Sequence, residues 1–373
     1  MYSQQELDDA VASGVITAEA AAALRAHIEL QRSTAIPDEE QFRLITGFND
    51  IFVSIAAAIL LFAVGWIGQS IGQSTGIVIS EHGEIGPSFL APLAVAGTAW
   101  ALALFFTAKR RMALPSILLL LAFVGGVLAT SAFLLVQIIG PDRFQNANDI
   151  LAATVGGVSA AIAAVAAWLH WRRFQVPITV AAGAAAVAGI FLALVIGIIQ
   201  PGDSQAAKNL ILGFVLLLGI GVFLFAMWWD ASDRARLTRR SDVAFWLHLL
   251  AAPMIAHPIF TIMGLNNGAV TTGEALVVVG LYVLFGLTAL AIDRRALLVS
   301  ALAYVLYALT ELFKQFGAVE LNVALTALVI GSALLMLSAY WHQARRLVVT
   351  KLPSNLQERL PNLDRPAITQ QAA

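Results

Sequence analysis

Ten stretches of about 20 consecutive, mainly apolar residues recur along this chain of 373 residues. A stretch of that length crosses the ~30 Å hydrocarbon core of a bilayer as an α-helix. Backbone groups without hydrogen-bond partners are excluded from lipid, and these Ala-, Leu-, Val- and Gly-rich runs do not alternate as barrel strands do. We therefore predict an all-α, polytopic membrane bundle. The predicted spans are 51–70, 89–107, 113–136, 150–170, 176–199, 209–228, 243–263, 274–292, 296–313 and 322–341.

The composition agrees with this class and excludes several others. Only 12% of the residues are charged, against ~25% in soluble proteins. The chain has no cysteine, which excludes disulfide scaffolds, thiolate catalysis and iron–sulfur centres. Because 22 Lys and Arg stand against 23 Asp and Glu, no nucleic-acid surface is expected. We expect the lipid bilayer as a partner and no cofactor. The loop 81–84 contains a single histidine, so we do not expect it to bind a metal ion.

The segments between the spans divide into a basic side and a side poor in basic residues. The basic side holds 19 of the 22 Lys and Arg residues, and the other side holds only Arg143, Lys208 and Lys314. Basic residues are retained on the cytoplasmic side of membrane proteins. We therefore predict a multi-pass membrane protein with both termini in the cytoplasm. The basic segments are 1–50, 108–112, 171–175, 229–242, 293–295 and 342–373.

Residues 1–36 predict a cytoplasmic helical hairpin. A first helix over 6–13 ends at Gly14, which tolerates the left-handed conformation of a helix end. Thr17 is the expected N-cap of a second helix over 18–31. The expected apolar seam consists of Leu7, Ala10, Val11, Val15, Ile16, Ala20, Ala23, Leu24 and Ile28. Because so small a hairpin is not stable alone, we expect it to cap the cytoplasmic face or to bind a protein partner.

Two segments flank the transmembrane domain, which is expected over 51–341. Residues 37–50 predict an interfacial helix that leads into the first span, with Phe42, Ile45 and Phe48 toward the lipid headgroups. Residues 342–373 contain three prolines and predict a disordered cytoplasmic tail.

Short patterns recur at a spacing of about 60 residues. Residues 110–115 and 172–177 share the pattern Arg-Arg-x-x-aliphatic-Pro, and a partial copy without the proline lies at 294–299. On the other side, residues 138–141 and 198–201 both read Ile-Ile-x-Pro. Agreement at both ends favours a duplicated two-helix hairpin of ~60 residues. The alternative is that every short inner turn requires arginine for orientation and proline at a helix start.

The beginning of the chain resembles a known family. Residues 14–20 read Gly-Val-Ile-Thr-Ala-Glu-Ala, and Phe42 precedes Gly-Phe-Asn-Asp at 47–50. These motifs are similar to those of an uncharacterised family of bacterial multi-spanning membrane proteins with a domain of unknown function. The resemblance is confined to about the first 60 residues. It implies a bacterial inner membrane and no established activity, and it supplies no catalytic residues.

Ionisable groups inside a membrane are costly and are therefore the first candidates for a site. Glu311 is an acidic residue within the body of a predicted helix, near the outer end of the ninth span, and Lys314 lies one turn further on. One interpretation is a carboxylate that binds an ion or couples protons. The alternative is an i,i+3 ion pair that reaches the water at the membrane surface.

The second candidate is His257 in the seventh span, between Pro253 and Pro258. Prolines free backbone carbonyls and kink a helix, so a polar cavity could open there, with Asn266 following on the outer side. The alternative is a neutral histidine that donates to a freed carbonyl. His248 lies on the opposite helix face and is not expected to pair with His257. His170, at an inner boundary, is expected to belong to an aromatic belt.

The sequence favours a non-enzymatic role in assembly, sensing or interaction through the N-terminal hairpin. The main alternative is a transporter of small molecules or ions with a polar site around His257 and Glu311. An intramembrane hydrolase is more remote, since it rests on Ser159 in a Gly-Val-Ser sequence with His257 as its base. The substrate, the partners and the oligomeric state stay open.

Overall fold

The computed structural model describes residues 11–24, 48–81, 84–145, 148–234, 236, 238–263, 271–315 and 321–363. The chain divides into two compact units, of which the first comprises residues 1–42 and 364–373 and the second residues 43–363. Each unit is described by itself below.

The second unit is an all-α bundle, as predicted. Among the described residues, nine helices are long and apolar enough to cross a membrane. They are α3 (Phe48–Thr75), α5 (Ala113–Ile139), α7 (Asp149–Phe174), α8 (Ile178–Ile199), α9 (Gln205–Ala231), α10 (Arg239–Ile262), α11 (Thr272–Ile292), α12 (Ala296–Gln315) and α13 (Asn322–Ala339).

The remaining elements are shorter. The helix α4 (Leu90–Phe106) occupies the second predicted span and is apolar, but its 17 residues reach only about 25 Å. The others are the hairpin of β1 (Ser80–Glu81) and β2 (Glu84–Ile85), and the helices α6 (Pro141–Gln145), α14 (Trp341–Val349) and α15 (Ser354–Gln357).

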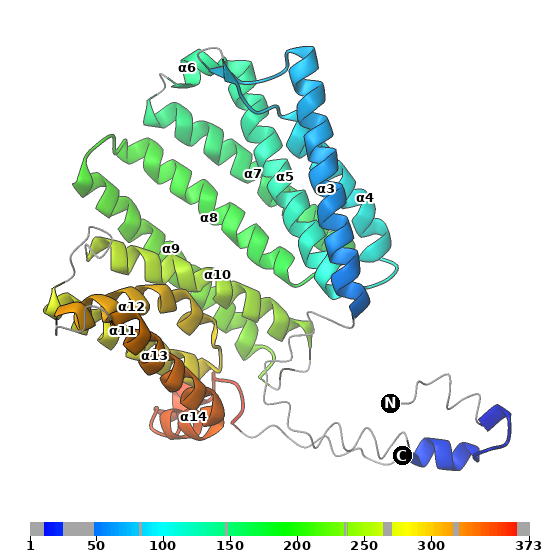
Figure 1. Ribbon diagram of the computed structural model, residues 1–373, viewed down its shortest axis with the longest axis vertical. Coiled ribbons are helices and arrows are strands. Elements are labelled where there is room, and N and C mark those ends of the chain that lie inside the picture. The colour runs from blue at the N-terminus through cyan, green and yellow to red at the C-terminus, as the bar shows by residue number, and fades with distance from the viewer. Residues whose placement is uncertain are drawn as a thin grey trace. The chain divides into compact units, whose positions relative to one another are not determined.

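Neighbouring helices pack in antiparallel hairpins that follow one another across the unit (Figure 1). The first group contains α3, α4 and α5, and α7 and α8 extend it toward α9 and α10. The second group contains α10, α11 and α12, with α13 against α12 and α14 against α11. The short turns alternate between two ends. We call the end that carries residues 107–112, 175–177, 232–238, 293–295 and 340–363 the basic end.

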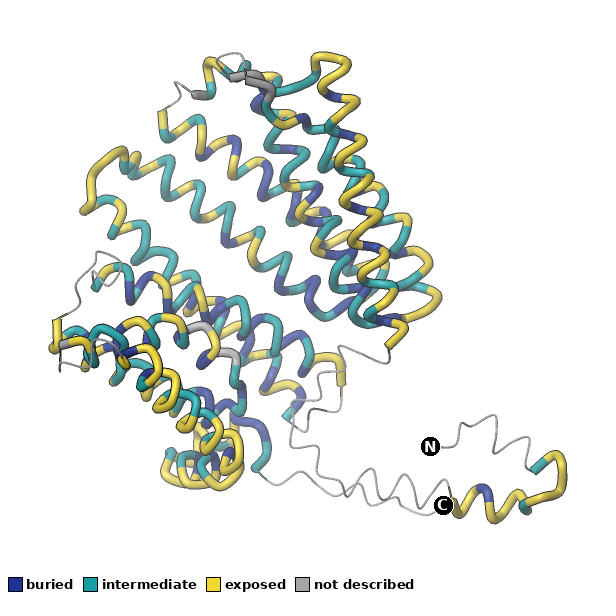
Figure 2. The backbone as a smooth tube through the Cα atoms, in the orientation of Figure 1, coloured by how far each residue is buried: buried dark blue, intermediate teal, exposed yellow. Residues whose placement is uncertain are grey.

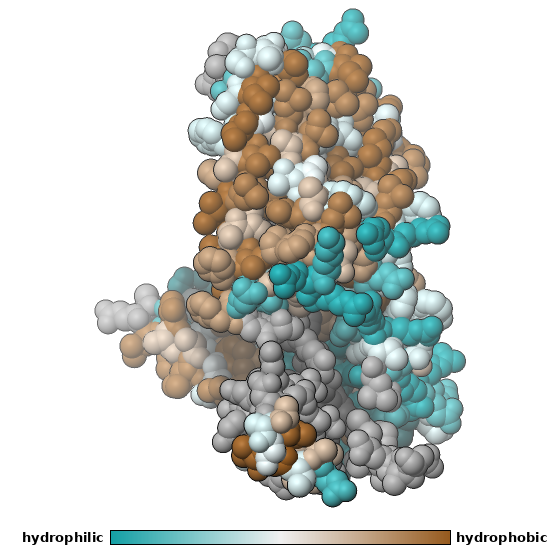
Figure 3. All heavy atoms as spheres, turned by 90° about the vertical axis from the view of Figure 1, so that its right-hand side faces the viewer, coloured by the Kyte–Doolittle hydropathy of each residue, from teal (hydrophilic) through white to brown (hydrophobic). Residues whose placement is uncertain are grey.

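The outward faces of the helices are apolar, as a lipid environment requires. Figure 2 shows exposed residues along the outer sides of α3 and α13 and buried residues between neighbouring helices. Phe62 and Trp66 of α3 are among the exposed large side chains, as are Trp228 of α9 and Leu335 of α13. Figure 3 shows hydrophobic residues over the upper part of the face that includes α3 and α4, with a band of hydrophilic residues at its lower edge. These features define an integral, polytopic membrane protein.

Small residues set the closest helix approaches. A Cβ atom built on Gly157 of α7 would lie 3.2 Å from Ala193 of α8, and one on Gly189 would lie 3.4 Å from Ala160. These two helices therefore pack closely through their alanine and glycine residues. Between α9 and α10 the approach is closer still, because a Cβ on Gly219 would lie 2.9 Å from the backbone of Met254.

We expect Gly219→Ala to destabilise the bundle by about 1–3 kcal/mol, since an added methyl group there forces two backbones apart. Gly221 of the same helix has open space around it. The matched variant Gly221→Ala should therefore be neutral or gain up to about 1 kcal/mol from helix propensity. Unfolding of both variants in mixed micelles measures the difference, and equal effects would contradict the close approach of α9 and α10.

The C-terminal segment differs from the prediction of a disordered tail over 342–373. Up to Leu363 it is ordered, and it contains α14 and α15. The reason is an amphipathic pattern in which Trp341, Arg345 and Val349 share the buried face of α14. Leu360 is buried in the same apolar cluster, together with residues of α10, α11 and α12. Residues 364–373 lie outside the described part of the chain.

The first unit agrees with the predicted turn of the N-terminal hairpin. Gly14 has a φ of +73°, and the Thr17 hydroxyl accepts a hydrogen bond from the Ala20 backbone N–H at 3.1 Å, as expected of an N-cap. The predicted seam is wrong at Val15, Ala20, Ala23 and Leu24, which are exposed, because the face that is buried after this turn carries Ala21 instead. Leu7, Ala10, Ile28 and residues 37–47 of the predicted interfacial helix lie outside the described residues.

The turns of the two proposed repeat copies share their backbone conformation at one end of the bundle only. At the outer turns, α5 ends at Gly140 (φ +97°) and α8 at Gln200 (φ +47°), and a proline follows each of them. At the basic turns the left-handed residue is Arg111 in one copy and Gln175 in the other, and these two positions are not equivalent. Duplication stays a prediction.

Candidate functional site

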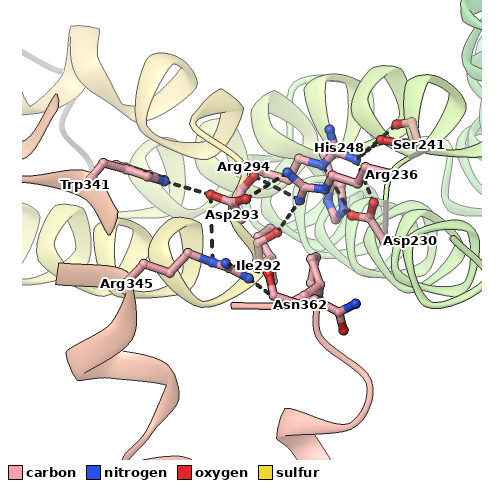
Figure 4. Close-up of polar contacts among 11 residues, drawn as sticks. Asp230, Arg236, Ser241, His248, Ile292, Asp293, Arg294, Trp341, Arg345 and Asn362 are labelled. Carbon is pink, nitrogen blue, oxygen red and sulfur yellow. Dashed lines mark hydrogen bonds and ion pairs between the residues drawn. The ribbon is translucent and has the colours of Figure 1, made fainter. Parts of the chain in front are cut away.

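Among the described residues, most of the charged side chains buried in the bundle gather at the basic end, where α9, α10, α11, α12 and α14 meet, and Asp50 of α3 is buried elsewhere. Figure 4 shows the side chains of this end in two sets of polar contacts, which meet where Asp293 and Arg294 follow one another in the chain. We call the two sets together the basic-end cluster. It consists of Asp230, Arg236, Ser241, His248, Asp293, Arg294, Trp341 and Arg345.

The first carboxylate of the cluster is Asp230, in the last turn of α9, and its side chain is fully buried. Arg294 Nη2 donates to Asp230 Oδ1 at 2.6 Å, and His248 Nε2 donates to Asp230 Oδ2 at 3.0 Å. Because a carboxylate only accepts, the His248 hydrogen lies on Nε2. Arg294 also donates to the Ser241 carbonyl oxygen at 3.0 Å. One acid thus joins α9, α10 and the turn before α12.

The second carboxylate is Asp293, which ends α11 in the left-handed conformation (φ +56°). Arg236 Nη1 donates to Asp293 Oδ2 at 2.9 Å, and Arg236 Nη2 donates to the Ile292 carbonyl at 3.0 Å. Trp341 Nε1 donates to Asp293 Oδ1 at 2.7 Å, and Arg345 Nε lies 3.8 Å from the same oxygen. The turn between α11 and α12 is therefore fixed from two sides.

Arginines of the same end hold the C-terminal segment. Arg345 donates to the carbonyls of Pro361 (2.7 Å) and Asn362 (3.1 Å), and Arg234 Nε donates to the Leu360 carbonyl at 2.9 Å. Carbonyls of a segment without regular structure need donors when they are buried. The arginines supply them, so residues 357–362 are joined to the ends of α9 and α14.

The buried charges of the cluster stabilise the fold only while each of them keeps its partner of opposite charge. Removing one partner from a buried ion pair leaves an uncompensated charge in a medium of low dielectric constant. Burial raises the pKa of Asp293, but the Arg236 and Arg345 guanidinium groups and the Trp341 hydrogen bond outweigh it. The net result is a pKa of Asp293 below its usual range.

A depressed carboxyl pKa contributes stability above the pKa of the unfolded chain, and this contribution is lost as the pH falls through the folded pKa. We therefore expect the thermal midpoint in detergent to fall as the pH is lowered below about 4. Asp293→Asn should lower the midpoint at pH 7 and flatten its acid decline. Asp203→Asn, at a fully exposed aspartate, is the control and should leave the curve unchanged. An acid decline of the same steepness in Asp293→Asn would refute this role of Asp293.

The residues singled out from the sequence lie elsewhere. His257 is an exposed residue of α10, and its Nδ1 lies 2.6 Å from the Tyr304 hydroxyl of α12. Glu311 and Lys314 form an i,i+3 ion pair of 2.6 Å near the end of α12, with the lysine exposed. Asn266 lies outside the described residues. The histidine bonds to Tyr304 and not to Glu311 or Lys314.

His248 does not pair with His257, in agreement with the prediction, and is the buried partner of Asp230. One prediction about the histidines is wrong. His170, expected in an aromatic belt, is fully buried. Its Nδ1 lies 3.2 Å from the Thr179 hydroxyl, and its ring packs against Phe174. Packing of α7 against α8 takes this ring away from the membrane boundary.

The hydrolase hypothesis required Ser159 to bond to a histidine. Ser159 is buried in α7, and its hydroxyl has no hydrogen-bond partner among the described residues. The described histidines therefore do not activate it. In the part of the chain that the structure describes, no group of three potential ligands for a metal ion is present.

The basic-end cluster had a signal in the sequence that orientation alone does not explain. In the turns 108–112 and 171–175 every charged residue is basic, whereas the turns 229–242 and 293–295 contain aspartates as well. Arginine is sufficient to orient a span, so acids in such a turn indicate pairing.

No family model, no curated protein and no solved structure matches this chain. The class of protein follows from the fold alone, and its role has to be inferred from the geometry of the cluster.

Proposed function

We propose that this protein is a non-enzymatic membrane scaffold of the bacterial inner membrane. Both termini lie in the cytoplasm, and the N-terminal hairpin is the element that binds a protein partner. The observation that carries the proposal is that the buried charges connect separate segments of the chain. They join the ends of four membrane helices to the C-terminal segment 341–363, which makes the basic end a fixed surface.

Three features support this proposal. The positive-inside rule assigns the basic end to the cytoplasm, where a fixed surface is accessible to soluble proteins. The carboxylates Asp230 and Asp293 are each bonded to arginine, so they act in holding segments together. In the first unit, Val15 has 76% of its surface exposed in a hairpin too small to be stable alone. A hairpin of this size needs a partner to be stable, and its exposed apolar side chains are available for that contact.

The proposal is tested by site-specific photocrosslinking in cells, with the photoreactive residue at Val15. We expect one defined protein adduct, and we expect it to disappear when Leu24, a second exposed large apolar residue among the described residues of the hairpin, is changed to Asp. A photoreactive residue at Ser354, outside the hairpin, is the control. Adducts only with lipid, or the same adduct from both positions, would overturn the role of the hairpin.

A transporter is the second candidate, and one observation favours it. His257 and Tyr304 form a polar contact between two helices, in the part of α10 that contains Pro253 and Pro258. A proton or a polar solute can be bound by such a pair.

Reconstitution into vesicles with a panel of labelled solutes separates the two candidates. The scaffold proposal predicts no uptake above that of empty vesicles. Uptake that is lost in His257→Ala or in Glu311→Gln, with Thr288→Ala unaffected as the control, would contradict the scaffold and support transport.

A further inference from the structure

A cavity of about 170 Å³ opens beside the basic-end cluster, between α11, α12 and α13. Its walls are almost wholly apolar and come from Leu298, Leu302, Leu334 and Leu337, with Tyr282 at one side. An engineered protein cavity of ~150 Å³ binds benzene, so this one has room for an alkyl segment of about six carbons. The Tyr282 hydroxyl is buried without a hydrogen-bond partner among the described residues.

The end of the cavity at the basic end is polar. Arg295 lines it and lies over the ring of Trp341, with 4.8 Å between the guanidinium carbon and the ring centroid. Leu302 lies seven residues after Arg295, which is about 10 Å further along the helix axis. The cavity thus runs from a cationic and aromatic margin into the hydrocarbon region, where tryptophan and arginine mark the headgroup level.

The charge around this margin is positive. The cluster beside it contains the two carboxylates Asp230 and Asp293 and the three guanidinium groups of Arg236, Arg294 and Arg345. Arg295 adds a fourth guanidinium. Whatever the protonation state of His248, the sum is +2 or more. A net positive charge at the cytoplasmic end of an apolar cavity between membrane helices is the arrangement that binds anionic lipid headgroups.

We propose that this cavity binds an anionic phospholipid of the surrounding bilayer. One alkyl chain lies against Leu298, Leu302 and Leu337, and the headgroup phosphate contacts Arg295. This site is independent of the scaffold role and of the N-terminal hairpin. A chain segment fits because the walls are apolar, and a phosphate fits because the one charged residue among the described wall residues is a cation.

The test uses the full chain in detergent, mixed with equal amounts of phosphatidylglycerol and phosphatidylcholine, and counts the retained lipids by native mass spectrometry. We expect the wild type to retain phosphatidylglycerol. Its retention should fall about tenfold in Arg295→Gln, as the loss of a charge-assisted contact predicts. Leu302→Trp, which fills the cavity, should abolish retention of both lipids. Ser338→Phe narrows the cavity from the exposed side of α13 and serves as a second filling variant if Leu302→Trp does not fold.

The matched controls are Arg240→Gln, an exposed arginine of the same end, and Leu284→Trp, an exposed leucine of α11 outside the cavity. Both should retain lipid as the wild type does, and added glycerol phosphate should displace nothing. Equal retention of the two lipids by the wild type would overturn the proposal. So would wild-type retention in Arg295→Gln, or a lipid-free dimer that Leu302→Trp dissociates.

Discussion

Arg294→Met should destabilise the bundle by about 3–5 kcal/mol, the cost of leaving a buried carboxylate without its cation. Asp230 is fully buried and loses its 2.6 Å contact in this variant, while the His248 hydrogen bond alone stays. The methionine fills much of the arginine stem's volume, so the loss measures the contacts of Arg294 with Asp230 and with the Ser241 carbonyl and not a cavity. The measurement is the free energy of unfolding in mixed micelles.

A double-mutant cycle isolates the pair. Asp230→Leu combined with Arg294→Met removes both charges, and we expect it to be more stable than either single variant, because replacing a whole buried ion pair is often close to neutral. Arg240→Met, at an exposed position, is the control and should change stability by less than about 0.5 kcal/mol. Additive losses in the double variant would show that Asp230 and Arg294 do not interact.

Trp341→Ala is the second variant for which a large effect is expected. The side chain is 3% exposed, it packs against Leu297 and Leu298, and it donates to Asp293. Truncation of a buried tryptophan costs about 3–5 kcal/mol. Because Trp341 begins α14, we also expect the segment 341–363 to become susceptible to limited proteolysis.

Trp341→Phe separates the ring from its hydrogen bond. It keeps the aromatic packing and loses only the contact with the Asp293 carboxylate, so a loss of about 1.5–3 kcal/mol is expected. Trp228→Phe in α9 is the control, since that ring is 64% exposed on the outer face of the bundle. Resistance of Trp341→Ala to protease at wild-type levels would contradict the anchoring of α14.

The span positions could be predicted from the sequence because hydrophobic length is a local property. Each predicted span overlaps a helix of the structure, and α4, α8 and α13, with 17, 22 and 18 residues, are each two residues shorter than expected. The N-cap at Thr17 and the helix end at Gly14 are local in the same sense. The ordered segment 341–363 was missed because its three-turn amphipathic pattern is short and its prolines resemble those of a disordered tail.

The basic-end cluster could not be assembled from the sequence, because Asp230, His248 and Arg294 come from three separate segments. The positive-inside rule explains the arginines of the basic turns through the orientation of the spans, but it does not explain the aspartates. His257 and Glu311 were singled out by their place inside predicted spans. In the structure His257 contacts Tyr304, and Glu311 pairs with Lys314. Only the second pair is close in the sequence, so only that pair could be predicted from local spacing.

Cysteine accessibility tests most directly the central claim that the basic-end cluster holds residues 341–363 on the cytoplasmic face. The chain has no cysteine, so every signal comes from an introduced one. With a membrane-impermeant maleimide, Leu356→Cys, which is 47% exposed, should react in inside-out vesicles and not in right-side-out vesicles. Leu360→Cys, at a position 6% exposed, should be protected in both and become reactive when Arg294→Met is added. Labelling of Leu356→Cys from the outside, or equal labelling of the two positions in the intact protein, would contradict the account.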